Sequence, residues 1–357
     1  MIRQFGPAAA LTVIALTAAL ILGGPKDLAI VAILGVLEIS LSFDNAVVNA
    51  KVLERMHPTW QKLFLTVGIL IAVFGMRLVL PVFIVSITAH LSIPDVIDLA
   101  TNNATEYGHK LDDAKEAIYA FGGTFLFMIF LDYVLDVERD IFWLKPIEKR
   151  LARIGKLDQL SVIIAIGGIM LMTYLAAEDK AKTVLIAGLI GLGAYLAVNA
   201  LDNLFEDSMD DDGDASASAG GMTGAVFKAG VFTFLYLEIL DASFSFDGVI
   251  GAFAISNKVL VIALGLGVGA FWIRSLTLYL VRKGTLSEYV YLEHGAHWAI
   301  GVLAIIMILQ VKYEVPEVVT GLTGVAFIGL ALISSLAERK RSQDAPDDDD
   351  KVPAAVA

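Results

Sequence analysis

The sequence contains no cysteine in its 357 residues. This absence excludes disulfide bonds, zinc–thiolate sites and thiol nucleophiles. The chain also lacks a phosphate-binding glycine loop, which indicates that it has no site of the common ATP-hydrolysing type. It lacks a zinc-peptidase helix and a serine nucleophile elbow, which are common hydrolase motifs. We therefore expect no enzymatic activity, no organic cofactor and no nucleic-acid partner.

The residues that are present are mostly apolar. Hydrophobic residues make up 57% of the chain and the mean hydropathy is +0.74, which is well above the usual values for a soluble domain. Repeated apolar runs of about twenty residues are typical of helices that cross a lipid bilayer. We expect an all-α polytopic membrane protein with about ten transmembrane helices. The expected spans are 8–23, 28–50, 63–89, 117–137, 160–177, 183–201, 222–246, 259–281, 295–311 and 317–336.

The net charge of −12 comes largely from two acidic stretches at 205–214 and 347–350. Such runs are typical of solvated linkers and tails. The second stretch belongs to "DDDDK", which matches a protease-tag sequence. The expected organisation is a first membrane repeat with the start of the second (1–202), an acidic linker (203–220), the rest of the second repeat (221–336) and a tail (337–357).

Lysine and arginine predict the orientation of the chain. If 138–159 is cytoplasmic, that side carries more than twice as many basic residues in its loops as the other side. Both termini and the acidic linker are then cytoplasmic, in a bacterial inner or plasma membrane. The segment 138–159 itself resembles a basic amphipathic stretch lying on the inner leaflet.

A polar motif, "EISLSFDN", interrupts the apolar run at 38–45. Ionised carboxylates within the hydrocarbon region cost several kcal/mol, at least about 2.5 by insertion scales, and usually mark function. The motif recurs as "DASFSFDG" at 241–248, at an offset of 203 residues. Residues of the following spans recur at almost the same offset, which indicates a duplicated unit. The matched pairs are Glu38 with Asp241, Ser40 with Ser243, Ser42 with Ser245, Asp44 with Asp247, Asn45 with Gly248, and Arg77 with Arg274.

The repeated unit contains about five spans. Because five is odd, the second copy enters the membrane from the opposite side, which gives an inverted-topology repeat. Such transporters bind their substrate near the midplane, where broken helices of the two halves meet. Gly248 and Gly251 predict a break after the second motif, and a break in the first motif is a weaker expectation because that motif has no glycine.

The motif chemistry suits a cation. Carboxylates gathered in one cavity repel each other unless protons or a cation intervene. Oxygen ligands without thiolate favour manganese, magnesium or calcium. The four acids are Glu38, Asp44, Asp241 and Asp247, and Asn45 with Ser40, Ser42, Ser243 and Ser245 offers neutral oxygens.

A competing interpretation is that the acids form buried ion pairs with Arg77 and Arg274. Two arginines neutralise only two of four acids, so we favour ion binding, with the arginines holding the acids in place. Two further features are supporting candidates. Glu238 is an extra acid near the second motif, and His294 with His297 share a helix face at the start of span 9, as a metal-entry or proton-relay site or as part of an interfacial belt.

At these residues the sequence resembles the TerC family of integral membrane proteins, within the LysE-like transporter superfamily. The resemblance rests on "LEISLSFDNAVVNA" (37–50) and "DASFSFDGVIGAFAISN" (241–257), and it covers roughly 28–336. The chain is most similar to a branch defined only as a domain of unknown function, with "EHGAH" (293–297) as its signature.

The resemblance implies a divalent metal exporter, with manganese as the favoured substrate and protons as a candidate coupling ion. By position, the implied metal-facing residues are Glu38, Asp44, Asn45, Asp241 and Asp247. The family's serine after the second aspartate is Gly248 here, and Glu238 is a candidate replacement for the lost ligand. Two alternatives stay open. They are a membrane scaffold for tellurite-resistance or stress proteins, using 203–220 and 138–159, and an exporter of a small organic solute.

Overall fold

The computed structural model describes residues 2–157, 159–210, 224–256, 258–283 and 289–344. The side chains of some helical residues, Asp44 and Asp247 among them, lie outside this description. Within the described ranges all regular structure is helical, and the chain is an all-α polytopic membrane protein, as predicted. The elements are α1 (Ile2–Leu41), α2 (Phe43–Arg55), α3 (Pro58–Leu70), η1 (Ile71–Val79), α4 (Leu80–Ala89), α5 (Ile93–Asn102), α6 (Ala104–Asp113), α7 (Lys115–Leu135), α8 (Lys145–Ile154), α9 (Leu160–Leu175), α10 (Ala181–Asp210), α11 (Gly224–Ile255), α12 (Val259–Lys283), α14 (Leu292–Gln310) and α15 (Glu317–Asp344).

Seven helical stretches in the described ranges are long and apolar enough to cross a membrane. They account for eight of the ten expected spans, because α1 contains the first span and most of the second. The remaining two expected spans correspond to α9, which is shorter, and to α11, which carries the second motif. The seven are Phe5–Leu41, Pro58–Ala89, Lys115–Leu135, Ala181–Ala200, Val259–Arg282, Leu292–Gln310 and Val319–Arg341.

The first two expected spans are joined by a kink instead of a loop. Gly24 interrupts the helical geometry of α1 with φ 74° and ψ −166°, and Pro25 follows it. Glycine adopts positive φ without a steric penalty, and proline cannot donate the helical hydrogen bond, so the pair divides α1 into two helices that meet at a sharp kink. Helix α10 continues to Asp210, into the expected linker at 203–220, and residues 211–223 lie outside the described part.

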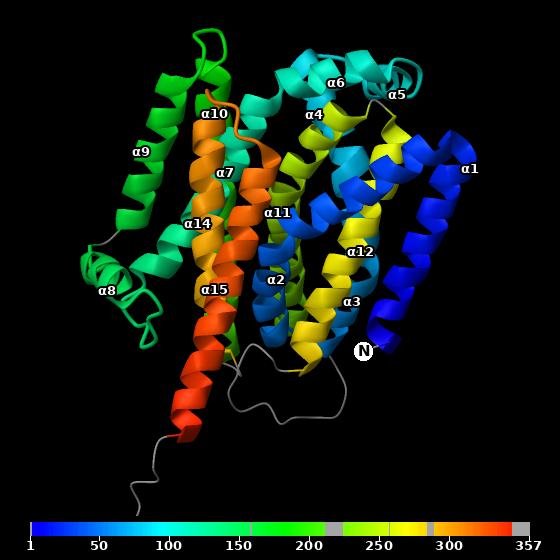
Figure 1. Cartoon of the computed structure of the whole chain (residues 1–357). Coiled ribbons are helices and arrows are strands. Elements are labelled where there is room, and N and C mark those ends of the chain that lie inside the picture. The colour runs from blue at the N-terminus through cyan, green and yellow to red at the C-terminus, as the bar shows by residue number, and fades with distance from the viewer. Residues whose placement is uncertain (1, 158, 211–223, 257, 284–288, 345–357) are drawn as a thin grey trace, which may run out of the picture.

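The two halves of the chain run in opposite directions (Figure 1). The continuous helix α3–η1–α4 rises from the lower to the upper end of the figure, whereas α12 descends. Likewise α7 descends and α14 rises, and α2 descends beside the rising α11. Since α3 and α12 follow the two copies of the motif, their opposite directions match the expected inverted repeat.

Both ends of the described chain lie at one end of the bundle. α1 begins and α15 ends at the lower end in Figure 1, whereas α5 and α6 cover the upper end. The predicted cytoplasmic location of the termini and of 138–159 stays a prediction.

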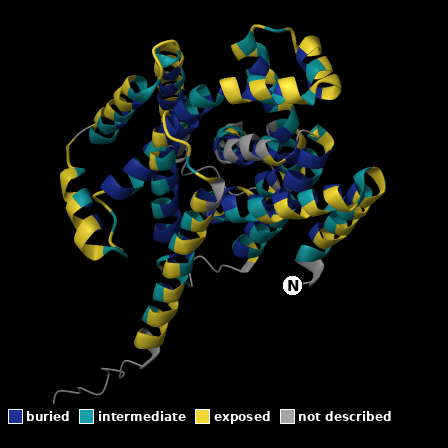
Figure 2. Ribbon diagram, turned by 45° about the horizontal axis from the view of Figure 1, so that its top comes forward, coloured by how far each residue is buried: buried dark blue, intermediate teal, exposed yellow. Residues whose placement is uncertain are grey.

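Small residues allow the central helices to approach closely. A Cβ atom on Gly123 of α7 would lie 3.1 Å from the Cβ of Met307 on α14. Because lipid is as apolar as leucine, such close packing drives helix association in membranes. Figure 2 shows buried residues gathered in the middle and exposed ones on the outer helices. Tyr174 on α9 is 85% exposed and Ile21 on α1 is 77% exposed, as expected for lipid-facing positions.

Candidate functional site

The first motif lies at a helix break. α1 ends at Leu41, Ser42 has φ −103° and ψ 14°, and α2 begins at Phe43. This confirms the weaker of the two expected breaks. The break predicted at Gly248 and Gly251 is wrong, because α11 runs without interruption from Gly224 to Ile255. Glycine permits a break in a helix but does not require one when the surrounding helices support the continuous form.

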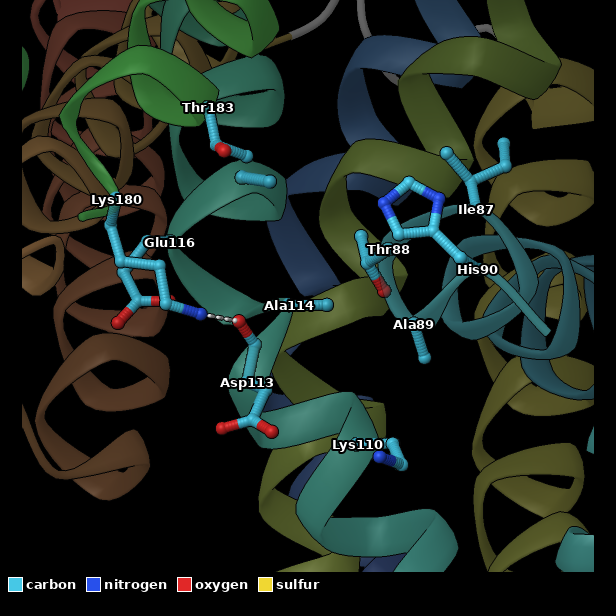
Figure 3. A pocket seen from close by; sticks show the side chains of 11 residues that line it. Ile87, Thr88, Ala89, His90, Lys110, Asp113, Ala114, Glu116, Lys180 and Thr183 are labelled. Atoms are coloured by element: carbon cyan, nitrogen blue, oxygen red, sulfur yellow. Dashed lines mark hydrogen bonds between the residues drawn. The ribbon is translucent and has the colours of Figure 1, made fainter.

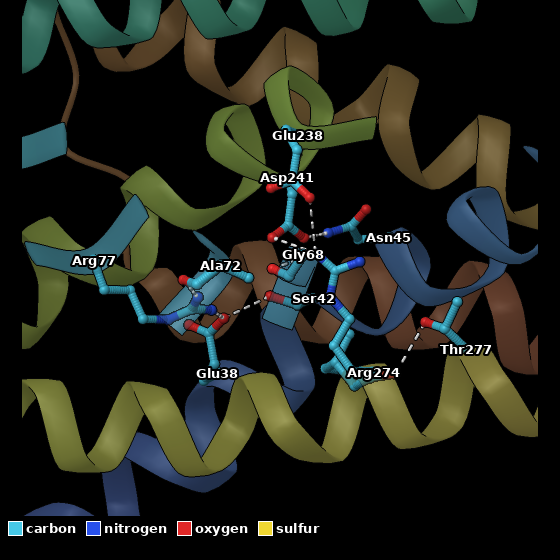
Figure 4. Close-up of polar contacts among 11 residues, drawn as sticks. Glu38, Ser42, Asn45, Gly68, Ala72, Arg77, Glu238, Asp241, Arg274 and Thr277 are labelled. Atoms are coloured by element: carbon cyan, nitrogen blue, oxygen red, sulfur yellow. Dashed lines mark hydrogen bonds and ion pairs between the residues drawn. The ribbon is translucent and has the colours of Figure 1, made fainter. Parts of the chain in front are cut away.

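Glu38, the first acid of the motif, forms a buried ion pair with Arg77 (Figure 4). The two residues are 1% and 5% exposed. Arg77 Nη2 donates to Glu38 Oε1, and Ser42 Oγ donates to the same oxygen at 2.9 Å. Arg77 Nη1 donates to the carbonyl of Ala72, five residues earlier in the π-helix η1. Both terminal nitrogens of Arg77 are therefore engaged.

Asp241, the equivalent acid in the second motif, forms the equivalent pair. Arg274 Nη2 lies 3.4 Å from Asp241 Oδ2, and both residues are buried. The guanidinium of Arg274 sits 3.7 Å above the ring of Phe64 on α3, a cation–π contact. Each repeat thus pairs its first motif acid with its own arginine, a contact that both the ion-binding and the ion-pair interpretations of the sequence allow.

The motifs also contact each other across the repeats. Asn45 Nδ2 donates to Asp241 Oδ1 at 2.6 Å (Figure 4). A Cβ atom on Gly248 would lie only 2.7 Å from Glu38 Oε2. Because Asn45 matches Gly248 and Glu38 matches Asp241, the two contacts are equivalent. Each motif's acid reaches the last residue of the other motif, as a pseudo-twofold axis between inverted repeats requires.

The other predicted residues divide into three groups. Ser243 is buried and donates to the carbonyl of Ile239 at 2.9 Å, and Ser245 is also buried. Ser40 donates to the carbonyl of Val36 in its own helix. Asp44 and Asp247 stand on α2 and α11 immediately before Asn45 and Gly248, but their side chains lie outside the described residues. Among the described residues, no three acidic or histidine side chains are grouped so as to hold a metal ion.

A second polar cluster, which the sequence did not reveal, centres on Glu148 of α8. Its carboxylate is fully buried and accepts hydrogen bonds from Trp298 Nε1 at 2.8 Å and from the backbone of Trp143 at 2.9 Å. Arg139 Nη2 lies 3.3 Å away and His294 Nδ1 lies 3.2 Å away. Burial alone would raise the pKa of Glu148, but the hydrogen bonds and charges of these partners outweigh it and lower the pKa to about 2.

The cluster ties α8 to α14. The available sequence signal was that Glu148 is the one acid in the otherwise basic helix Lys145–Ile154. The two histidines belong to the same contact region. The ring of His297 stacks on that of Tyr133, with 3.6 Å between the ring centroids, and its Nδ1 forms a hydrogen bond with the carbonyl of Glu293. Glu293 also pairs with Lys51 at 2.9 Å. His294 and His297 therefore lie apart from the motif acids.

A cavity of about 420 Å³ opens between the end of α4, the α6–α7 junction and the start of α10 (Figure 3). His90, Lys110, Lys180, Asp113 and Glu116 supply its polar lining. Lys180 Nζ donates to the carbonyl of Asp113 at 2.7 Å, which links the residue before α10 to the end of α6. No motif residue lines this cavity, so it is separate from the paired acids.

Comparison with known proteins confirms the resemblance to a domain-of-unknown-function branch, whereas the resemblance to the TerC family stays a prediction. Residues 43–342 match the family described as "Protein of unknown function (DUF475)". The chain belongs to this family. It is also 30% identical over 147 residues to "Uncharacterized membrane protein YceF" of Bacillus subtilis (strain 168), an alignment that covers 40% of this chain and 55% of that protein. The chain thus spans about half the length of this curated relative. No solved structure matches the chain.

Proposed function

We propose that this membrane protein is a transporter that moves a divalent metal cation, with manganese favoured, through a site between its two inverted repeats. The observation that carries the proposal is the contact of Asn45 with Asp241, which joins the two motifs inside the membrane. The proposed ligand set is Glu38, Asp44, Asn45, Asp241 and Asp247.

Charge balance supports a cationic substrate. The motif region holds five acids, the four motif acids and Glu238, against two arginines. Arg77 and Arg274 can neutralise at most two of them, and uncompensated carboxylates in the membrane are costly. A divalent cation, or protons when the site is empty, would remove the excess negative charge. Oxygen ligands without thiolate favour manganese, magnesium or calcium.

The ion pairs assign different roles to the acids. Glu38 is held by Arg77 and Ser42, and Asp241 by Arg274 and Asn45. We propose that these pairs fix the two motifs face to face. Asp44 and Asp247, next to the crossing on α2 and α11, would carry most of the charge that meets the cation.

Transport would follow from rocking one repeat against the other around this crossing, the usual mode of inverted-repeat transporters. We propose export, with both termini in the cytoplasm and protons as the coupling ion. The larger number of basic residues in the loops assigned to the cytoplasm supports this orientation.

The test is flux measured with purified protein in proteoliposomes. Manganese, magnesium, calcium and zinc would be offered separately, and empty liposomes would serve as the baseline. We expect manganese flux well above that baseline. Flux of none of the four cations would refute the proposal, and flux of an amino acid in their place would support the organic-solute alternative.

A further inference from the structure

Glu238 is a buried carboxylate with an incomplete set of partners. It lies on α11, three residues before Asp241, and is 5% exposed. Among the described residues, neither of its carboxylate oxygens has a hydrogen-bond partner. The charged groups acting on it are Arg274 on α12 and Asp241 on its own helix. A buried carboxylate left in this state is costly, so its presence calls for an explanation.

Glu238 breaks the symmetry between the repeats. Its match in the first repeat is Gly35. The two positions occupy equivalent helix crossings, since a Cβ atom on Gly35 would lie 3.5 Å from the carbonyl of Gly265, and one on Gly68 would lie 2.9 Å from Glu238 Oε1. Gly68 and Gly265 are themselves matched, because they are 197 residues apart, as Arg77 and Arg274 are. One of these two crossings thus pairs Gly35 with Gly265, whereas the other pairs Gly68 with the carboxylate of Glu238.

Arg274 has a looser set of contacts than Arg77. Its Nη2 lies 3.4 Å from Asp241 Oδ2, 3.8 Å from Glu238 Oε1 and 3.5 Å from the carbonyl of Gly68. Its Nη1 has no hydrogen-bond partner among the described residues. The guanidinium therefore has an unused donor next to a carboxylate with unused acceptors, and Phe64 supports it from one face.

We propose that Glu238 is the second ion-pair partner of Arg274, and that Arg274 moves from Asp241 to Glu238 when a cation binds Asp241. This inference rests on the proposed cation transport. Without Glu238, a cation arriving at Asp241 would leave a buried guanidinium unpaired, which costs several kcal/mol. With Glu238 present, Arg274 stays paired throughout and Asp241 is released to the substrate.

The same comparison assigns the first repeat a fixed role. Arg77 uses both terminal nitrogens, on Glu38 and Ala72, and the position equivalent to Glu238 is a glycine. Among the described side chains, Glu38 therefore has no competing acid to take its arginine. The second repeat is the one whose acid becomes available to the cation.

The test compares manganese binding by wild-type protein, Glu238→Gln and Glu238→Asp at equilibrium in detergent. We expect Glu238→Gln to bind manganese at least tenfold more weakly with little change in melting temperature, and Glu238→Asp, which keeps the charge, to recover most of the affinity. Glu293→Gln is the matched control, because Glu293 is a membrane acid paired with Lys51 outside the motifs. It should bind manganese as the wild type does.

A double-mutant cycle separates this role from simple packing. Once Arg274→Gln has removed the guanidinium, Glu238→Gln should cause no further loss of manganese affinity. Equal losses in both backgrounds, or Glu238→Gln binding within twofold of wild type, would overturn the inference while leaving cation transport intact. Absence of manganese binding by wild-type protein would refute both proposals.

Discussion

The side-chain amide of Asn45 donates a hydrogen bond to the carboxylate of Asp241, with 2.6 Å between Nδ2 and Oδ1 and a sequence separation of 196 between the two residues. Its equivalent in the other direction is the close approach of Glu38 to Gly248. These two contacts make the motifs a single structure built from both repeats. The predictions below test the parts of that structure separately.

Replacing Asn45 tests the contact between repeats. Asn45→Leu keeps the approximate size and removes the donor to Asp241, so we expect a loss of about 1 kcal/mol in the free energy of unfolding, the usual scale for such bonds in membranes. Asn45→Asp should destabilise more, because it brings a second carboxylate against Asp241. Denaturant titration in detergent measures both. Equal stability of wild type and Asn45→Asp would contradict the contact.

The Glu38–Arg77 pair should show strong coupling. Glu38→Gln leaves a buried guanidinium without its counter-ion, and we expect it to cost about 3–5 kcal/mol. Arg77→Met should cost a similar amount for the opposite reason. The double variant removes both charges, so its loss should be well below the sum of the single losses. Additive losses in the same unfolding assay would show that the two side chains are independent.

Gly248 tests how closely Glu38 approaches the second motif. Gly248→Ala would place a Cβ atom 2.7 Å from Glu38 Oε2, and we expect the resulting strain to cost about 1–3 kcal/mol. Gly248→Ser should cost at least as much. Gly167 on α9 is the matched control, because a Cβ there meets nothing within 4 Å. Gly167→Ala should leave the melting temperature unchanged or raise it. Similar losses of stability at Gly248 and Gly167 would argue against the close approach of Glu38 to Gly248.

Glu148 gives a prediction about acid stability. Its pKa is lowered from 4.5 to about 2 in the folded state, so its stabilisation is fully present above pH 4.5 and is lost as the pH falls towards 2. The shift corresponds to about 3 kcal/mol. Glu148→Gln cannot ionise and should lack this part of the acid dependence. Unfolding free energies measured from pH 5 to pH 2 should therefore fall more steeply for wild type, and parallel curves would contradict the cluster around Glu148.

Much of this arrangement could be predicted from the sequence because the repeat itself carries the information. Matching "EISLSFDN" to "DASFSFDG" pairs Glu38 with Asp241, and the repeat of the following spans pairs Arg77 with Arg274. An odd number of spans per repeat then predicted the opposite directions seen in Figure 1. The orientation that the charge of the loops predicts, with both termini in the cytoplasm, stays a prediction.

The errors came from properties that depend on packing. Gly248 and Gly251 permit a break, but α11 is continuous, whereas the break at Ser42 occurs without a glycine. Glu148 and His294 are 146 residues apart, and no local pattern shows that a basic surface helix directs its one acid into the protein. Ser40 also matches Ser243 in the repeat, yet its hydroxyl donates to a backbone carbonyl of its own helix. Repetition identifies equivalent positions but does not show which atoms meet.

The most direct test of the proposed transport is manganese flux through proteoliposomes containing wild type, Asp44→Asn, Asp247→Asn or the double variant. Asp132→Asn is the control, because Asp132 is an acid on α7 that accepts from Tyr195 at 2.7 Å, outside both motifs. The account predicts that the wild type and Asp132→Asn transport manganese, that each motif variant is impaired, and that the double variant is inactive while still folded. Wild-type flux in the folded double variant would contradict it.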